Sequence, residues 1–582
     1  MKLTLEKSEL ALAMDTLRGP MRSVLLFGMV TNLLVLAPTG YMLEVYGRVV
    51  TSRSSSTLFM LTLLVIGVYV LLEILEWVRT SIIYIGAHRL DELLANRLFD
   101  ATFQYHLKKI VGIPPQALTD LHIVRNFLAS SAFIAIIDAP FAIMFIILVY
   151  FISPWLGYAA LIGGAITVVV GLLTEQGIRK PLADANRVAQ EAQYYASGAL
   201  RNTQAIEAMG MLDTVYLLWK QRQQRFLMEQ AQASDQAGFG SSISKLVQTL
   251  QGSLLLGLGC WLTLSGDIDP QGGMMVVGSV LSARALTPMV MVIGQWRQVV
   301  QAREAYSRLE QFLSNIPKVS PGMSLPPPRG VLQVDNLSVT APGTQTLLLR
   351  GVQFVLQPGE VLGIVGPSGA GKTTLARLLV GLWPATTGKV RLDGVDVFTW
   401  NKNELGPYVG FLSQAVELFD GTVTENIARF GENDKQKVTA AAQMVGLHET
   451  IMALPQGYNT TIGLDGVVLS GGQRQRLGLA RALYGDPQYI ILDEPNSNLD
   501  EAGESALLVT LAGLKKRGAT VVVITHRTAL LAAVDKMMVI RDGQMQAYGP
   551  RDEVLAAIKR AMEGANNSAS QQNKLTPTGK PA

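Results

Sequence analysis

Cysteine is nearly absent from this 582-residue sequence, which contains only Cys260. A single thiol excludes an intramolecular disulfide and a zinc site built from cysteines. Charged residues are also scarce, at 16% of the chain against about 25% in an average soluble protein. The formal net charge is only +4, and no basic tract indicates binding to nucleic acid.

We expect no cleavable secretory signal, because acidic residues interrupt the N-terminus before any apolar run begins. The chain is too long for one ordinary domain. Apolar residues make up 49% of it, and the mean hydropathy is +0.28. These values indicate a membrane segment joined to a soluble segment.

The first half of the chain contains long apolar runs. A helix needs about 20 mostly apolar residues to cross roughly 30 Å of hydrocarbon. The candidate spans are 22–46, 56–78, 129–152, 156–174, 246–265 and 273–296. Six crossings place both ends of the chain on the same side of the bilayer, and the nucleotide-binding motif described below makes that side the cytoplasm.

Basic residues gather in the two connections that this topology places inside, after the second and fourth spans. The short connection 153–155 carries no Lys or Arg, as the positive-inside rule predicts. The first outer loop, with Arg48 and Arg53, departs from the rule. Apolar residues at helical spacing over 90–103 and 188–227 predict helices that extend out of the membrane, with turns near Pro114–Pro115 and around Gly198–Gly210.

Two charges, Asp138 and Arg284, fall inside predicted spans. A charge in the hydrocarbon region costs several kcal/mol unless it is paired or hydrated. We expect both to face a central cavity and to pair with each other; snorkelling to the interface is the alternative. Glu73, Glu76 and Arg79 are expected at the inner membrane interface.

The composition divides the chain into five parts. These are a short N-terminus over 1–21, a transmembrane domain over 22–313, a proline-rich linker over 314–330, an α/β domain over 331–562 and a polar tail over 563–582 that is predicted to be disordered.

The stretch Gly366–Thr373 matches the phosphate-binding pattern G-x-x-x-x-G-K-[ST] without substitution. It follows an apolar strand over 361–365 and opens a helix, which is the context that the pattern requires. Backbone N–H groups and the helix dipole favour an anion there. The predicted nucleotide contacts are Gly366, Pro367, Ser368, Gly369, Ala370, Gly371, Lys372, Thr373 and Thr374. The alternative is a glycine-rich turn that binds nothing.

Three further strands end in polar side chains. Asp493 and Glu494 follow the strand 489–492, Gln414 follows 409–413, and His526 follows 521–525. In parallel α/β sheets, ligands bind beyond the carboxyl ends of the strands. Thr373, Gln414 and Asp493 are therefore predicted ligands of Mg²⁺, and Glu494 is the predicted base for an attacking water, with His526 on the γ-phosphate. Taken alone, His526 fits an ordinary loop and Gln414 a solvated turn.

A second anion site is predicted at the helix that begins after Leu469. The small residues of this stretch leave backbone N–H groups free, although Ser470 also fits a plain helix cap. The predicted contacts are Ser470, Gly471, Gly472 and Gln473, with Asp500 further along the chain.

In their order along the chain, these motifs resemble the Walker A, Q-loop, signature, Walker B, D-loop and switch histidine of ABC ATPases. The resemblance covers 331–562. It implies a membrane all-α six-helix domain of the exporter type followed by an α/β P-loop ATPase domain. It also implies a half-transporter that hydrolyses ATP with Mg²⁺, in which two chains form a homodimer and sandwich two ATP molecules between Walker A of one and the signature of the other. Segments 117–125 and 199–209 resemble coupling helices.

Two departures from the family pattern stand out. The family places an adenine-stacking aromatic residue upstream of Walker A, whereas 336–342 contains none. Leu464 stands where exporters commonly have Glu, which puts the usual communication between membrane and ATPase domains in doubt.

Within the family, the chain resembles the type I secretion exporters of Gram-negative bacteria that lack an N-terminal peptidase domain. The stretches Ala37–Tyr46, Asp138–Phe141 and Leu492–Asp500 carry this resemblance. It implies a multi-pass protein of the inner membrane bilayer with both termini cytoplasmic. It also implies three partners: a secreted protein with a C-terminal signal, a periplasmic membrane-fusion adaptor and an outer-membrane channel.

Three alternatives remain from the sequence. One is an ABC exporter of lipid, peptide or drug with the same ATPase. Another is a soluble ABC ATPase of DNA repair or chromosome maintenance, against which the spans argue. The third is a regulatory ABC protein without turnover, against which Glu494 and His526 argue.

Overall fold

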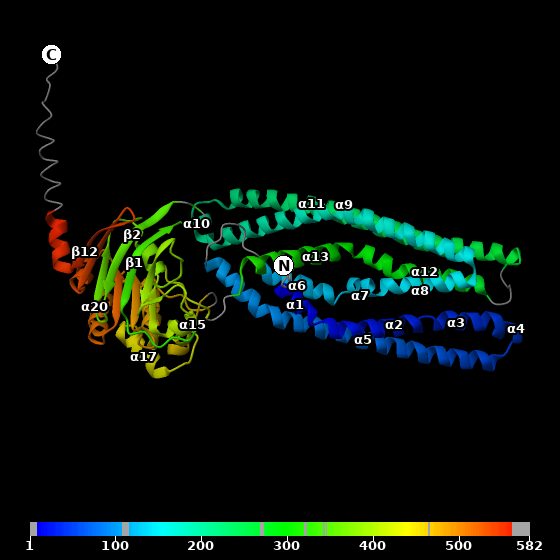
Figure 1. Cartoon of the computed structure of the whole chain (residues 1–582), viewed down its shortest axis with the longest axis horizontal. Helices are drawn as coiled ribbons and strands as arrows, with labels where there is room; N and C mark the ends of the chain where they lie inside the picture. The colour runs from blue at the N-terminus through cyan, green and yellow to red at the C-terminus, as the bar shows by residue number, and fades with distance from the viewer. Residues whose placement is uncertain are drawn as a thin grey trace, which may run out of the picture. The chain divides into compact units, whose positions relative to one another are not determined.

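The computed structural model describes residues 8–107, 116–267, 273–318, 323–341, 344, 346–463 and 466–560. The chain divides into two compact units, one of Met1–Gln104 with Pro114–Lys318 and one of Tyr105–Ile113 with Val319–Ala582. The first unit is helical and the second is built on a large sheet (Figure 1). The predicted turn at Pro114–Pro115, Leu464 and the predicted disordered tail all lie outside the described residues.

The helical unit consists of long helices joined by short turns. Its elements are α1 (Glu9–Asp15), α2 (Arg18–Leu34), α3 (Ala37–Glu44), the π-helix η1 (Val45–Val49), α4 (Val50–Ser52), α5 (Ser55–Leu107), α6 (Ala117–Leu128), α7 (Ser131–Asp138), the 3₁₀ turn η2 (Ala139–Phe141), α8 (Ala142–Ile152), α9 (Pro154–Arg201), α10 (Thr203–Ala208), α11 (Leu212–Leu264), α12 (Met274–Gly294) and α13 (Trp296–Asn315).

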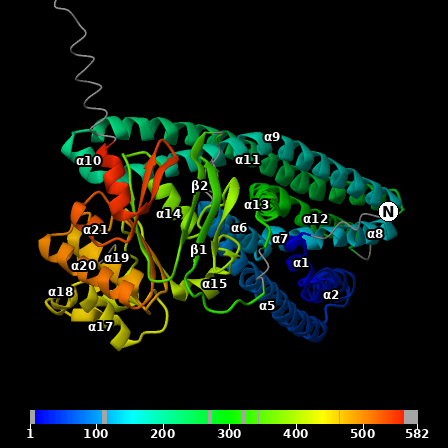
Figure 2. The same ribbon diagram turned by 60° about the vertical axis from the view of Figure 1, so that its left-hand side comes forward.

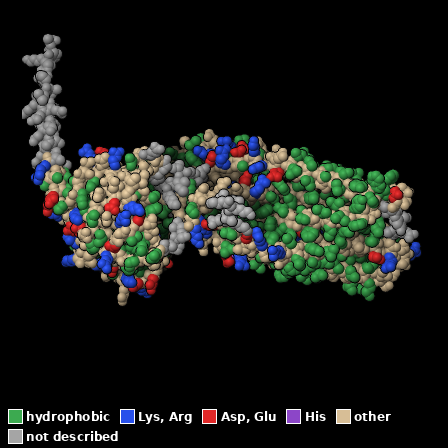
Figure 3. All heavy atoms as spheres, viewed as in Figure 1, with side chains coloured by type: hydrophobic (Ala, Val, Ile, Leu, Met, Phe, Trp, Pro, Cys, Tyr) green, Lys and Arg blue, Asp and Glu red, His purple; other side chains and the backbone are tan. Residues whose placement is uncertain are grey.

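Six helical stretches in the described part of the chain are long and apolar enough to cross a membrane. They are Arg18–Ser52, Ser55–Leu107, Ser131–Ile152, Pro154–Arg201, Leu212–Leu264 and Met274–Gly294, and each predicted span overlaps one of them. Only 6% of the most apolar stretch of α5 is buried within the unit. Figure 3 shows hydrophobic side chains over the broad middle of the helical unit and charged ones toward its ends. Apolar surface of this extent must be covered by lipid or by another chain.

Three of the helices extend well beyond the hydrocarbon region. The helices α5 and α11 have 53 residues each, and α9 has 48. At 1.5 Å per residue they are roughly 70–80 Å long, whereas the hydrocarbon core is about 30 Å thick. The predicted extensions over 90–103 and 188–227 are therefore present. Around Gly210, whose φ of +62° suits glycine, the chain turns from α10 into α11.

The helices α9 and α11 lie side by side over much of their length (Figures 1 and 2). Polar side chains of one helix rest on glycines of the other. A Cβ at Gly163 would come 1.6 Å from the Gln251 side-chain oxygen, and one at Gly240 would come 2.1 Å from the Thr174 hydroxyl. A larger residue at either position would force the facing side chain to shift, and small residues that allow such close approach are enriched where helices pack in membranes.

The second unit is a sheet with helices packed on it. Its strands are β1 (Leu332–Thr340), β2 (Leu347–Leu356), β3 (Val361–Val365), β4 (Thr387–Leu392), β5 (Val395–Asp396), β6 (Val409–Leu412), β7 (Gly421–Thr422), β8 (Thr461–Ile462), β9 (Tyr489–Asp493), β10 (Thr520–Ile524), β11 (Lys536–Arg541) and β12 (Gln544–Pro550). Its helices are α14 (Lys372–Leu379), α15 (Lys402–Leu405), α16 (Val423–Ile427), α17 (Lys435–Met444), α18 (His448–Met452), α19 (Gly471–Leu483), α20 (Glu501–Lys516) and α21 (Thr528–Ala532), with 3₁₀ turns η4 (Gly406–Tyr408) and η5 (Gly457–Asn459).

Ten strands form one sheet in the order β5-β4-β1-β2-β12-β11-β3-β10-β9-β6. The strands β6, β9, β10 and β3 are consecutive neighbours and all parallel. Their residues are almost wholly apolar and mostly buried, as expected for strands covered on both faces. The sequence prediction that these four strands deliver their polar ends to one edge of the sheet is therefore confirmed.

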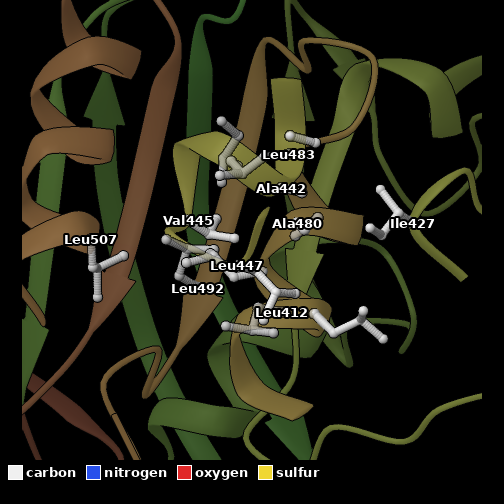
Figure 4. Packing of buried hydrophobic residues seen from close by; sticks show 14 of the residues in the cluster. Leu412, Ile427, Ala442, Val445, Leu447, Ala480, Leu483, Leu492 and Leu507 are labelled. Carbon is white, nitrogen blue, oxygen red and sulfur yellow. The ribbon is translucent and has the colours of Figure 1, made fainter. Parts of the chain in front are cut away.

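A hydrophobic core fixes the position of that edge. Leu412 of β6 and Leu492 of β9 pack against Ala442 of α17, Ala480 of α19 and Leu507 of α20, and all five are buried (Figure 4). Figure 2 shows α17, α19 and α20 grouped away from β1 and β2. The helix that follows the predicted signature is thus held against the strands that end in Gln414 and Asp493.

The charges of the helical unit pair differently from the sequence prediction. Asp138 accepts two hydrogen bonds from Arg79, at 2.6 and 3.1 Å, and not from Arg284. The predicted Asp138–Arg284 pair is therefore wrong. Arg79, the partner of Asp138, is 1% exposed. Glu76 lies 3.5 Å from Arg79, and Asn32 donates to Asp138. One ion pair with bidentate geometry thus joins α5 to α7, because neither charge is tolerated alone in an apolar surrounding.

The expectation that Asp138 and Arg284 face a cavity agrees with the structure. Both line one cavity of about 270 Å³, together with Asn32, Glu76 and Thr287. Within the described residues, Arg284 has no ion pair. Its guanidinium is exposed, whereas the carboxylate of Asp138 is committed to Arg79.

Replacing Arg79 by alanine should destabilise the helical unit strongly. The change leaves Asp138 as an uncompensated charge, which costs about 3–5 kcal/mol in buried pairs. The melting temperature of the purified protein in detergent should fall in Arg79→Ala and recover in part in Arg79→Ala/Asp138→Ala. Arg284→Ala, on the same cavity, is the matched control and should melt like the wild type. Equal melting temperatures for Arg79→Ala and Arg284→Ala would contradict the assignment.

Candidate active site

The loop 366–371 joins β3 to α14 and can be built only with glycine at three positions. A Cβ at Gly366 would come 2.1 Å from the Ile540 carbonyl oxygen, and one at Gly371 would come 2.7 Å from the Leu349 side chain. Gly371 and Gly369 also have φ of +97° and +79°, a backbone conformation that residues other than glycine rarely adopt. Steric limits and backbone conformation together explain the pattern of glycines. Of the other predicted contacts here, Ala370 is buried, Thr374 is half-buried, and Pro367 and Ser368 are exposed.

Lys372 is the first residue of α14, and its side chain is turned back over the loop. The ammonium donates to the carbonyls of Gly366 at 2.7 Å and Pro367 at 2.8 Å, and the residue is 7% exposed. Burial lowers the pKa of Lys372, whereas the carboxylates of Glu494 and Asp493 oppose that shift. A buried cation beside a helix N-terminus provides a strong local attraction for an anion.

Asp493 ends β9 and is 2% exposed. Burial raises the pKa of Asp493, and a hydrogen bond with the Thr373 side chain works in the opposite direction. The hydroxyl of Thr373 and the carboxylate of Asp493 are therefore adjacent, at the ends of the neighbouring segments α14 and β9. Hydroxyl and carboxylate oxygens are ligands that Mg²⁺ accepts.

Glu494 lies directly after Asp493 but in a different surrounding. Its φ is +50°, an uncommon value for a non-glycine residue, and its backbone N–H donates to the Ile524 carbonyl at 2.9 Å. Gln414 donates to one carboxylate oxygen at 3.2 Å, and the His526 ring nitrogen lies 3.7 Å from the other. The structure therefore brings together the predicted Gln414, Glu494 and His526 from three neighbouring strands.

Ser470 is the N-cap of α19 and forms a capping box with Gln473. The Ser470 hydroxyl accepts from the Gln473 N–H at 3.2 Å, and the Ser470 N–H donates to the Gln473 side chain at 2.9 Å. The plain capping role is thus present. Gly471 is exposed and Gly472 half-buried at the start of the same helix. Among the described residues, no hydrogen bond or ion pair joins this helix end to the loop 366–373.

Asp500 caps α20 and is held on the other side by an ion pair with Arg476 of α19. The hydrogen bond from the Gly503 N–H is the main cause that lowers the pKa of Asp500, and Arg476 adds to it. A Cβ at Gly472 would come 2.7 Å from the Asn498 carbonyl oxygen. The start of α19 and the turn 494–500 therefore form one packed element.

Two positions near the site were missed from the sequence. Gln475, which is buried in α19, donates to the carbonyl of Glu494 at 3.2 Å and so supports the backbone turn at Glu494. The Thr525 hydroxyl donates to Asn496 at 2.9 Å and joins the ends of β10 and β9. The sequence did contain a signal for Thr525, because it is a polar residue at the end of an otherwise apolar stretch, directly before His526.

Comparison with protein families gives two matches. Residues 349–497 match the model described as ABC transporter, and residues 23–287 match the ABC transporter transmembrane region.

Several curated proteins are similar over most of the chain. The type I secretion system ATP-binding protein PrsD of Rhizobium meliloti is 38% identical over 92% of both chains. The toxin RTX-I translocation ATP-binding protein of Actinobacillus pleuropneumoniae is 29% identical over 88% of this chain and 73% of its own length. The leukotoxin translocation protein LktB of Mannheimia haemolytica is 28% identical over the same shares.

A solved structure of a bacterial Atm1-family ABC exporter with ATP bound has the same fold. The TM-score is 0.79 at 20% identity, covering 93% of this chain and 97% of the exporter. The six long helices, the sheet with its phosphate-binding loop and the family matches lead to one conclusion: the chain belongs to the ABC transporter family and joins a transmembrane region to a nucleotide-binding ATPase domain.

Proposed function

We propose that the chain is the ATPase and permease component of a type I secretion system, which uses ATP to export a polypeptide across the inner membrane. The similarity to PrsD over nearly the whole length of both chains carries this proposal. The meeting of Gln414, Glu494 and His526 at one sheet edge supports turnover rather than binding alone.

In this proposal, the ATPase site divides its work between the loop and the strand ends. The N–H groups of Gly366–Thr373 and the ammonium of Lys372 hold the β- and γ-phosphates. The carboxylate of Glu494, oriented by Gln414, takes a proton from a water that attacks the γ-phosphorus as the bond to the ADP oxygen breaks. His526 contacts the γ-phosphate. The left-handed backbone at Glu494 fixes its carboxylate before substrate arrives.

The residues at the end of β9 fit Mg²⁺. Thr373 and Asp493 offer oxygen ligands that already hydrogen-bond to each other, and the Gln414 side chain lies near the adjacent Glu494. We propose Thr373, Asp493 and Gln414 as the residues that hold the ion. When bound, Mg²⁺ neutralises phosphate charge and lowers the electrostatic cost of a buried aspartate.

The signature residues are proposed to act on a second copy of the chain. Ser470, Gly471, Gly472 and Gln473 present a helix N-terminus at the surface, with Asp500 in the turn packed beside it. A site made from the loop of one chain and this helix end of another requires a homodimer with head-to-tail ATPase domains. Closing around ATP and reopening after hydrolysis is then a population shift between two arrangements.

Of the two expected coupling segments, 199–209 has the better support. None of the residues of α10 (Thr203–Ala208) is buried, so this short helix is available for contact. The segment 117–125 is not a turn but the first part of α6, and its Leu121 and Val124 are buried against the helical unit itself. We therefore propose α10 as the coupling element.

The stretch upstream of the phosphate-binding loop, where the family places an aromatic residue that stacks on adenine, has no aromatic side chain in the described residues 336–341.

The proposed partners follow from the relatives. PrsD and the two toxin translocation proteins are named for secretion or translocation. We propose that this chain sits in the bacterial inner membrane with both termini cytoplasmic. It would work there with a periplasmic adaptor and an outer-membrane channel on a polypeptide with a C-terminal signal. The soluble DNA-repair alternative is excluded by the match of 23–287 to a transmembrane region.

Replacing Asp493 by asparagine should stabilise the protein while it abolishes turnover. Burial raises the pKa of Asp493 in the folded protein, so folding disfavours the ionised carboxylate. The stability of the fold therefore declines as the pH rises through the pKa of this carboxyl group, and the ionised form costs stability at higher pH. In buffer with a chelator and no nucleotide at pH 8, the melting temperature of Asp493→Asn should rise by about 2–4 °C. Mg²⁺-dependent phosphate release should fall at least about 100-fold. A lower melting temperature would contradict the assigned cause.

Replacing Glu494 by glutamine should abolish both hydrolysis and export. The change removes the base but keeps its size, so phosphate release should fall about 10²–10⁴-fold while ATP remains bound. Cells that carry only Glu494→Gln should lose one secreted polypeptide from the medium. The control Glu449→Gln, at an exposed position of α18, should retain both activities. Loss of ATPase with an unchanged set of secreted proteins would contradict protein export, and continued hydrolysis would contradict the base.

A further inference from the structure

A polar groove lies in the helical unit where α6, α9 and α13 meet. It has a volume of about 320 Å³. The side chains that distinguish it are primary amides, namely Gln116, Asn186, Gln190, Gln193 and Gln301. Ile123 and Ala189 add a small apolar part. The nucleotide-binding machinery uses none of these residues.

The amides are arranged in rows along helix faces. On α9, Asn186, Gln190 and Gln193 have the spacing i, i+4 and i+7, which places them on one face. Gln301 and Arg308 are seven apart on α13. Each row is about 10 Å long at 1.5 Å per residue, which equals about three residues of an extended chain. The row of three amides on α9 is therefore of peptide-like length, and α13 adds one amide, Gln301, together with Arg308.

The hydrogen-bonding capacity of these amides is open. Within the described ranges, none of the five amide side chains forms a hydrogen bond with another part of the chain. Each amide carries two N–H donors and an oxygen that accepts, the same groups that a peptide bond offers. Their exposure is intermediate or high, so water or a ligand can reach them.

The groove carries no net charge. Arg308 donates to Asp120 at 2.6 and 3.1 Å, and both belong to the lining. Asp120 is buried and its two oxygens are occupied by the guanidinium, so the two charges of the lining balance each other. Glu304, whose carboxylate lies 3.8 Å from the same guanidinium, is not part of the lining. An uncharged ligand rich in both donors and acceptors is the complementary occupant.

The groove lies beyond the apolar spans. Residues 186–193 follow the predicted span 156–174, and residues 301–308 follow 273–296. By the topology proposed above, this is the cytoplasmic end of the helical unit. A polypeptide waiting to be exported would meet the groove before the hydrocarbon region.

We propose that this groove binds the main chain of an extended polypeptide through its amide side chains, with no dependence on the polypeptide's sequence. This inference rests on the proposed function, because it requires a polypeptide cargo. Recognition of main-chain N–H and C=O groups suits a transporter that must pass every residue of one long substrate. The apolar contacts of Ile123 and Ala189 are small enough not to select side chains.

The test measures binding of an uncharged synthetic Gly-Ser-Thr peptide, about 20 residues long and flexible by composition, to the full-length protein in detergent. Fluorescence anisotropy follows the labelled peptide and an analogue that is N-methylated at alternate peptide bonds. Methylation removes main-chain donors, so wild-type protein should bind the analogue about tenfold more weakly. This comparison requires no variant of the protein.

A pair of variants assigns the binding to the groove. Gln190→Leu/Gln193→Leu removes two amides at similar volume and should weaken the unmethylated peptide about tenfold. Gln221→Leu/Gln224→Leu, with the same spacing on exposed positions of α11, should bind like the wild type. Melting temperatures of both pairs show whether folding is preserved.

The outcomes separate the two proposals. Equal binding of both peptides, or full binding by Gln190→Leu/Gln193→Leu, overturns the groove but leaves polypeptide export intact. Absence of any peptide binding by the wild type, together with secretion that does not depend on this chain, overturns both. A photoreactive side chain at position 190 should cross-link to the peptide, and cross-linking to a second copy of the chain instead would make the groove a subunit interface.

Discussion

The catalytic arrangement depends on how the chain leaves β9. Two carboxylates that are adjacent in sequence must occupy different environments, because two negative charges together would disfavour ionisation of one of them. Asp493 ends the strand, buried beside Thr373, whereas Glu494 turns into the left-handed region and faces Gln414 and His526. The hydrogen bond from Glu494 N–H to the Ile524 carbonyl holds that turn to β10. One dipeptide therefore gives the proposed metal ligand and the proposed base separate surroundings.

The same turn is packed against the start of α19, the helix end that is proposed to act on a second copy of the chain. Gln475 of α19 donates to the Glu494 carbonyl, Gly472 packs on Asn498, and Arg476 pairs with Asp500. The helix that presents Ser470 at its N-terminus is therefore packed against the backbone turn that carries Glu494. In the proposed dimer, these contacts would connect closure at one site to the geometry of the other, since the helix end and Glu494 belong to the same packed element.

Much of the fold was predictable because its signals are local. The phosphate-binding loop is specified by glycines whose φ values and close contacts leave no alternative, and the four buried strands appear as short apolar runs that end in polar residues. The six spans follow from run length alone. The charges in the helical unit were not predictable in this way. Asp138 pairs with Arg79, which is 59 positions away on another helix, and only packing decides between it and Arg284. Gln475 and the amide groove were also hidden, because each gains meaning only when separate helices meet.

The central claim is that a complete ATPase site takes Walker A from one chain and the signature helix from another. The most direct measurement mixes two inactive variants, Lys372→Ala and Ser470→Arg, and records ATP hydrolysis after subunit exchange verified with two affinity tags. If sites are shared, each mixed dimer contains one site with an intact loop and an intact signature. Activity should then reach roughly a quarter of wild type, since half of random dimers are mixed and each has one of two sites restored. A mixture no more active than either variant alone would contradict the account.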